Sequence, residues 1–190
     1  MIRTPKFGIV AGEKSGDILG ASLMVSLRKR YPNARFVGVG GSEMIALGCE
    51  SLTSMDRLSV MGFVEPLGRL PELLILKKRL QDRLIKEDVA AFIGIDSPDF
   101  NLRLAKTLHK RGLKTIHFVS PSVWAYRKAR IHSIKNSVDL MLTLFPFELD
   151  IFKKNGVPVT CVGHPLADQI DFEDRKPTHR RLYGISEKST

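Results

Sequence analysis

Two short polar segments of the sequence carry residue types that could do chemistry. The first, GEKSGD at residues 12–17, places a carboxylate, an ammonium group and a hydroxyl between two glycines. Glycines allow a tight turn close to a ligand, and the free amides of a following helix favour an anion. The pattern matches neither GxGxxG nor GxxxxGK[ST], so it predicts no dinucleotide or P-loop site. The alternative is an ordinary turn into a helix, with Ser15 or Asp17 as its cap.

The second polar segment is DSPDFN at residues 96–101. Asp96 directly follows an apolar run, and Pro98 predicts the start of a helix. A partly desolvated carboxylate at the carboxyl end of a buried strand is well placed as a general base. The alternative is that Asp96 and Asp99 only cap the helix that follows.

Two other loops offer binding chemistry. In VSPSVWAYR, residues 119–127, Trp124 and Arg127 could stack on a sugar and clamp a phosphate. A buried anchoring role for Trp124 and a solvated basic helix face at residues 127–130 are the alternatives. His164, in GHPL at residues 163–166, could reach a cleft, although a structural role is the commoner outcome for a lone histidine.

An apolar segment broken by glycine and proline, residues 60–71, precedes the run LLILKKR at residues 73–79. Apolar residues followed by basic ones could lie at a membrane surface or hold acyl chains. The alternative is an amphipathic helix packed on a sheet.

The elements that must position these loops are predicted by the apolar pattern. Continuous apolar runs, typical of strands covered on both faces, occupy residues 7–11, 35–39, 89–95, 115–119, 140–144 and 159–162. Segments with helical spacing lie between them, and Gly112 marks the end of one. This alternation predicts an α/β fold with a doubly wound, mainly parallel, Rossmann-like sheet. Ligands bind such sheets outside the carboxyl ends of the strands, where these loops must gather.

Composition limits the class of protein. The 190 residues are 43% hydrophobic and 26% charged, which argues against disorder, and the formal net charge is +10. That charge predicts an anionic partner, but no nucleic-acid motif is present, so no nucleic acid is expected. Cys49 and Cys161 are far apart in the sequence and do not have the CxxC or Cys/His spacing of metal ligands, so they are expected to be free thiols in a reducing cytosol. We expect no signal peptide and no transmembrane segment.

The segments GEKSGD, VMGFVEPLGRLP, FIGIDSPDFN, HFVSPSVWAYR and VGHPLAD occur here in the order and spacing of the bacterial lipid A disaccharide synthase family. The chain resembles that family from about Phe7 to Asp168, and more weakly through Gly184 and Ile185. The resemblance implies the N-terminal Rossmann-like domain of an inverting GT-B glycosyltransferase. Residues 1–170 would form this acceptor-side domain. Residues 171–190 would be a linker or the start of a UDP-binding C-terminal domain. The rest of that domain would be a partner of this chain, with a dimer as one way of supplying it.

The resemblance also implies a reaction. UDP-2,3-diacylglucosamine and 2,3-diacylglucosamine 1-phosphate (lipid X) would give the β-1,6-linked disaccharide 1-phosphate and UDP. The step would take place in the cytoplasm, on a protein peripherally associated with the inner membrane. No cofactor and no metal are implied. The alternative is a truncated fragment that binds lipid or membrane without catalysis.

The matching positions yield candidate site residues. Asp96 is the candidate catalytic base. The candidate substrate-binding residues are Gly12, Glu13, Ser15, Gly16, Asp17, Asn101, Ser120, Trp124 and Arg127. The candidate membrane or acyl-chain contacts are Val60, Met61, Phe63, Leu73, Leu74 and Leu76.

Overall fold

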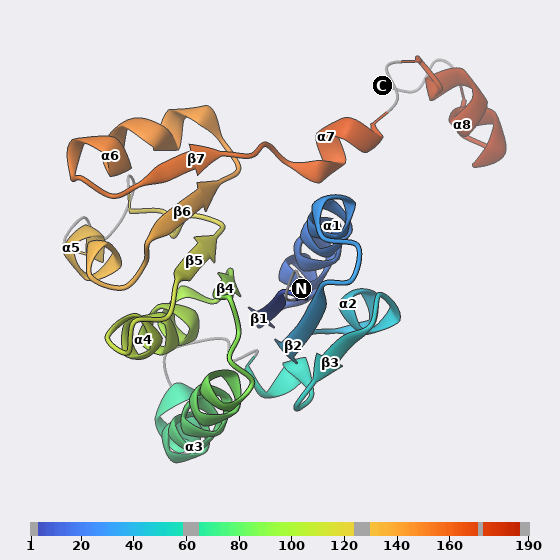
Figure 1. The fold of residues 1–190 in the computed structure, drawn as a ribbon. Helices are drawn as coiled ribbons and strands as arrows, with labels where there is room; N and C mark the ends of the chain where they lie inside the picture. The colour runs from blue at the N-terminus through green and yellow to red at the C-terminus, as the bar shows by residue number, and fades with distance from the viewer. Residues whose placement is uncertain (1–3, 59–64, 124–129, 171–172, 187–190) are drawn as a thin grey trace.

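The sheet is seven-stranded and entirely parallel, as shown by a computed structural model that describes residues 4–58, 65–123, 130–170 and 173–186 (Figure 1). The spatial order of its strands is β3-β2-β1-β4-β5-β6-β7. In chain order the strands are β1 Lys6–Ala11, β2 Arg35–Val39, β3 Cys49–Ser51, β4 Ala91–Ile95, β5 Thr115–Phe118, β6 Leu140–Thr143 and β7 Val159–Cys161.

Helices cover both faces of this sheet (Figure 1). One face carries α1 (Lys14–Arg30) and α2 (Ser42–Ala46), and the other carries α3 (Glu65–Lys86), α4 (Pro98–His109) and α5 (Arg130–Lys135). The remaining helices are η1 Met55–Arg57, η2 Pro146–Glu148, α6 Leu149–Lys154, α7 Pro165–Gln169 and α8 Lys176–Leu182. The predicted doubly wound α/β fold is confirmed.

The six predicted strands are all present, and Pro98 begins α4 as expected. Gly112 follows α4 with φ +81°, the left-handed conformation that ends helices. Strand β3 was not predicted, because its three residues include the exposed Glu50 and form no continuous apolar run.

The strand order reverses between β1 and β4. The chain runs outward from β1 to β3 and then returns to the other side of β1. Opposed crossovers on either side of such a switch point leave a crevice at the carboxyl ends of the two strands. Because Ala11 pairs with Ile95, the loops after β1 and β4 begin side by side at this point.

Two apolar layers, one on each face, hold the sheet. Leu76 is only 7% exposed and packs with Leu80, Leu84 and Phe92 beneath α3. This burial argues against the predicted contact of Leu76 with a membrane surface, because α3 turns the side chain toward the core, whereas its predicted contact with an acyl chain stays a prediction. Leu73 packs partly against the same cluster, whereas Leu74 is half exposed. Val60, Met61 and Phe63 lie outside the described residues.

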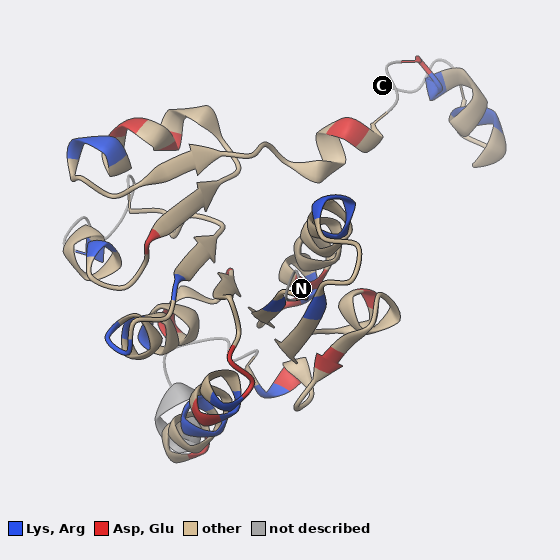
Figure 2. Ribbon diagram, in the orientation of Figure 1, with Lys and Arg blue, Asp and Glu red and all other residues tan. Residues whose placement is uncertain are grey.

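Part of the positive charge lies at the C-terminal ends of the crossover helices. These residues are Arg28, Lys29, Arg30, Arg83, Lys86, Lys106, Lys135, Lys153 and Lys154. There they complement the negative ends of the helix dipoles, at the edge of the sheet opposite the switch-point loops. Figure 2 shows lysine and arginine spread over several helices, with acidic residues among them. The net charge by itself therefore does not define a nucleic-acid groove.

The C-terminal part of the described chain leaves the sheet. After β7, α7 lies beside α1, and α8 lies apart from the sheet (Figure 1). The proposed change from a domain to a linker near residue 170 stays a prediction. Both cysteines are free; burial raises the pKa of Cys49 to about 12. Within the described ranges, no helix has the length and apolar character needed to cross a bilayer.

Candidate active site

The two polar loops predicted from the sequence touch each other. Gly12 is buried against the start of the second loop, and a Cβ atom at Gly12 would lie 2.8 Å from Ser97 Cβ and overlap its hydroxyl. Gly12 is therefore required by this close approach. A Cβ at Gly16, by contrast, would be 3.4 Å from the Ala11 Cβ and 3.5 Å from the Ile95 carbonyl oxygen, which are ordinary contact distances, so the packing of α1 on the sheet does not require glycine there.

Backbone strain gathers at the carboxyl ends of β4 and β5. Asp96 has φ +52°, Ser97 has φ +40° and Val119 has φ +77°. Non-glycine residues in this left-handed region cost on the order of 1–3 kcal/mol each, and such residues cluster at functional sites. The amide of Asp96 donates to the Phe118 carbonyl at 2.9 Å, which fixes the strained turn to the neighbouring strand.

Asn101 anchors this turn from α4. Its side-chain amide, fully buried, lies 3.2 Å from the Val10 carbonyl, 3.1 Å from that of Ile95 and 2.9 Å from that of Asp96. The predicted contact of Asn101 with substrate is therefore replaced by a positioning role, since its donors point at the ends of β1 and β4.

Asp17 is also enclosed. Its carboxylate accepts hydrogen bonds from the amides of Gly41, Glu43 and Met44, at 2.9 to 3.1 Å. The side chain is fully buried and caps α2 instead of the helix that contains it. The sequence predicted that Asp17 caps α1 or contacts the substrate. Because three backbone amides enclose its carboxylate, the structure gives it the role of a cap on α2 instead.

Asp96, Glu13 and Ser15 are accessible side chains of the two polar segments and carry groups that could contact a ligand. Asp96 is partly exposed, and no described residue donates a hydrogen bond to its carboxylate. Glu13 is at the N-cap of α1 without a side-chain cap bond, and Ser15 is exposed. Asp99 forms an ion pair with Arg130 on α5. This arrangement leaves one carboxylate, Asp96, on a strained turn at the switch point.

The third loop is described only up to Val123. Ser120 is nearly buried, and its hydroxyl donates to the Pro121 carbonyl at 3.1 Å. Trp124 and Arg127 lie outside the described residues, so their predicted substrate contacts stay predictions.

A groove of about 490 Å³ brings the first and last motifs together. Ser15 and Ile18 of α1 line it with His164 and Leu166 at the start of α7. The imidazole Nδ1 of His164 accepts from the Leu166 amide at 3.2 Å and thereby caps α7. This contact agrees with a structural role for His164, which was the alternative to a role in a cleft. In the part of the chain that is described, no group of acidic, histidine and cysteine side chains is placed to hold a metal ion.

A doubly wound parallel sheet with a carboxylate at its switch point defines a Rossmann-like domain of the kind that builds enzyme clefts. The fold resembles that of UDP-GlcNAc 2-epimerase from Neisseria meningitidis, solved with UDP-GlcNAc bound, with a TM-score of 0.56. The match covers 97% of this chain and 55% of that one at 7% identity, so it concerns the fold alone.

A model of the lipid-A-disaccharide synthetase family matches residues 7–190, and the chain belongs to this family. The lipid-A-disaccharide synthase of Saccharophagus degradans is 55% identical over 181 residues, which are 95% of this chain and 47% of the relative. The lipid-A-disaccharide synthase of Alcanivorax borkumensis is 57% identical over 169 residues, which are 89% of this chain and 44% of that relative. The resemblance seen in the sequence is confirmed. The chain spans about half the length of these curated relatives.

Proposed function

We propose that this chain is the acceptor-side half of a glycosyltransferase that makes the lipid A disaccharide. The observation that carries the proposal is Asp96, which is partly exposed on a strained turn beside Gly12. The proposed substrates are those implied by the family resemblance, UDP-2,3-diacylglucosamine and 2,3-diacylglucosamine 1-phosphate, and membership of the family supports them.

In the proposed reaction Asp96 accepts the proton of the acceptor 6-hydroxyl as its oxygen attacks C1 of the donor sugar. The bond from C1 to the UDP oxygen breaks, and UDP leaves with the bonding electrons. A single attack at C1, on the face of the donor sugar opposite UDP, converts the α-linkage to a β-linkage. Such a single displacement requires only one base, which removes the proton of the acceptor hydroxyl. A positioned base contributes about 10²–10⁴-fold to the rate.

Glu13 and Ser15 are proposed to orient the acceptor, because both are accessible beside Gly12 at the start of α1. The UDP-binding residues would come from a C-terminal domain outside this chain. No cofactor takes part in the proposed step.

A chimaera tests the proposal: residues 1–190 followed by the C-terminal half of the Saccharophagus degradans relative. Asp96→Asn should lower disaccharide formation at least about 100-fold with the fold unchanged by circular dichroism. Asp99→Asn is the matched control, because Asp99 is exposed and faces Arg130. Turnover by Asp96→Asn close to that of Asp99→Asn would exclude Asp96 as the base.

The exposed apolar residues of α3 support a peripheral contact with the cytoplasmic face of the inner membrane. Leu70, Leu74 and Ile75 are 41%, 50% and 55% exposed and lie within six residues of one helix. Side chains of this kind enter the interface of a bilayer. This contact is compatible with the full glycosyltransferase and with the alternative, a lipid-binding fragment without catalysis.

Co-sedimentation with phosphatidylglycerol vesicles tests this contact. Leu74→Glu should lower the bound fraction several-fold, because it places a charge at the interface. Ile85→Glu is the matched control, since Ile85 is also exposed but lies near the other end of α3. Equal binding by both variants would rule out this surface. Vesicle binding without turnover by the unsubstituted chimaera would favour the lipid-binding alternative.

A further inference from the structure

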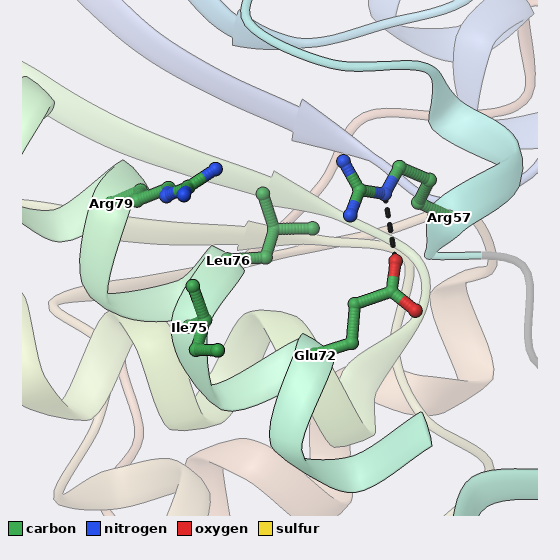
Figure 3. A pocket seen from close by; sticks show the side chains of 5 residues that line it. All are labelled: Arg57, Glu72, Ile75, Leu76 and Arg79. Carbon is green, nitrogen blue, oxygen red and sulfur yellow. Dashed lines mark hydrogen bonds and ion pairs between the residues drawn. The ribbon is translucent and has the colours of Figure 1, made fainter. Parts of the chain in front are cut away.

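A second hollow, of about 320 Å³, lies between η1 and α3 and was not foreseen from the sequence. Its lining consists of Arg57, Glu72, Ile75, Leu76 and Arg79 (Figure 3). Arginines so far apart in the sequence form no motif, and only the packing of α3 beside η1 brings them together.

The topology places this hollow near the edge of the sheet formed by the carboxyl ends of the strands, the edge at which the candidate active site also lies. Because η1 follows β3 and α3 leads back to β4, η1 and the first half of α3 lie toward the carboxyl edge of the sheet. Leu58, the residue after Arg57, has its Cβ 3.6 Å from the position that a Cβ on Gly12 would take. One residue therefore separates the hollow from the Gly12 turn.

The charges of the hollow favour an anion. Two guanidinium groups face one carboxylate, that of Glu72, which leaves a local charge of +1. The Arg57 Nε donates to Glu72 at 2.7 Å and its Nη1 donates to Thr53 Oγ1 at 3.3 Å, so this guanidinium is held in place. Figure 3 shows Arg57 and Arg79 reaching toward Leu76 from opposite sides.

The wall between the two arginines is apolar. Leu76 forms its buried part, and Ile75 is more than half exposed at its rim. Inorganic phosphate would leave this apolar surface unused, and an uncharged lipid would leave the net positive charge of the hollow without a counterion. A ligand that satisfies both parts carries a phosphate next to an apolar chain.

We propose that this hollow binds a phosphate monoester attached to an acyl or alkyl chain. A monoester presents three acceptor oxygens and up to two negative charges, which suits two guanidinium groups better than the phosphodiester of a bilayer lipid. The proposal deepens the proposed function and rests on it for the natural ligand, the phosphorylated diacyl acceptor.

Calorimetric titration of the 190-residue chain with dodecyl phosphate, below its micelle concentration, tests the site. Dodecyl phosphate should bind at least about tenfold more tightly than inorganic phosphate, dodecyl maltoside or dihexanoyl phosphatidylglycerol. Arg79→Gln should weaken dodecyl phosphate about tenfold, and Ile75→Ser should weaken it several-fold without changing the affinity for inorganic phosphate.

Matched controls separate the site from general charge and hydrophobicity. Arg111→Gln changes net charge equally at the opposite edge of the sheet, and Ile85→Ser removes an exposed isoleucine near the other end of α3. Equal affinities for dodecyl phosphate in Arg79→Gln and Arg111→Gln, or in Ile75→Ser and Ile85→Ser, would overturn the proposal. Binding of inorganic phosphate or of dihexanoyl phosphatidylglycerol as tightly as dodecyl phosphate would also overturn it.

The outcome is separable from that of the proposed function, because the titration needs no glycosyl transfer. Arg79-dependent binding by a chain whose chimaera has no turnover would contradict only the glycosyltransferase. An active chimaera whose chain binds dodecyl phosphate independently of Arg79 would contradict only this site.

Discussion

The side-chain amide of Asn101 donates a hydrogen bond to the backbone carbonyl of Asp96 across 2.9 Å. The bond joins the first turn of α4 to the left-handed residue that carries the candidate base. The same amide reaches the ends of β1 and β4, so it sets the switch point at which the two polar loops meet.

Asn101→Ala should lower the free energy of unfolding by about 1–3 kcal/mol, because buried carbonyl oxygens lose their donor. Asn101→Asp keeps the shape but turns a carboxylate toward the same carbonyls, so it should cost more than alanine. Urea unfolding at neutral pH measures both. Asn136→Ala, at an exposed position after α5, is the control. A stability of Asn101→Asp equal to that of the unsubstituted chain would contradict the positioning role.

Gly12→Ala should lower the stability of the fold, whereas Gly16→Ala should raise it. A Cβ at Gly12 overlaps Ser97, and such overpacking costs about 1–3 kcal/mol. A Cβ at Gly16 meets Ala11 and the Ile95 carbonyl at ordinary contact distances within α1, where alanine gains up to about 1 kcal/mol over glycine. Thermal unfolding of the two variants compares them directly. A loss of stability in Gly16→Ala as large as that in Gly12→Ala would show that the close approach is not specific to Gly12.

His117 should make stability depend on pH. Burial lowers the pKa of this imidazole, whose two nitrogens have no hydrogen-bond partner among the described residues, from 6.5 to about 4. Between these values the unfolded chain binds a proton that the folded chain does not. Stability should therefore rise with pH from about 4 to 6.5, by up to about 3 kcal/mol.

Replacing His117 by phenylalanine should remove this contribution, so the variant should lose less stability than the unsubstituted chain as pH falls from 6.5 to 4. The free energy of unfolding in urea, measured at several pH values, tests it. His179→Gln, on the exposed α8, should leave the dependence intact. An unchanged pH profile in His117→Phe would show that the buried imidazole is not its source.

Truncation to alanine should lower stability strongly at Leu76 and hardly at all at Leu74, two residues away on α3. Leu76→Ala creates a cavity in the core and should cost about 2–5 kcal/mol. Leu74→Ala, at a half-exposed position, should change stability by less than about 0.5 kcal/mol. Chemical denaturation measures both, and each serves as the other's control. Similar losses in the two variants would refute this orientation of α3.

Local pattern was enough to predict the strands, the alternation with helices and the two polar loops. Continuous apolar runs identify buried strands because both faces of a parallel sheet are covered. The carboxyl-end rule then places the following loops at one edge of the sheet. The position of Asp96 after β4 was predictable in this way.

Side-chain roles within those loops were not predictable from local pattern. Asp17 and Asn101 belong to polar segments of the sequence, a pattern that favours contact with a ligand, although the structure places both in the first turns of helices. Their donors and acceptors are instead used by backbone groups distant in the sequence, as in the contact of Asp17 with Gly41. Leu76 lies in an apolar run, where only the rotation of α3 about its axis decides which side chains face the core.

The fold class, the family and the two polar loops were therefore predictable without coordinates, because periodicity and motif order are properties of neighbouring residues. The tertiary structure decided which loop residues remain accessible, since burial depends on strands and helices that meet across long stretches of chain. It also brought Arg57 and Arg79 together, because only the packing of α3 beside η1 places their charges around one hollow.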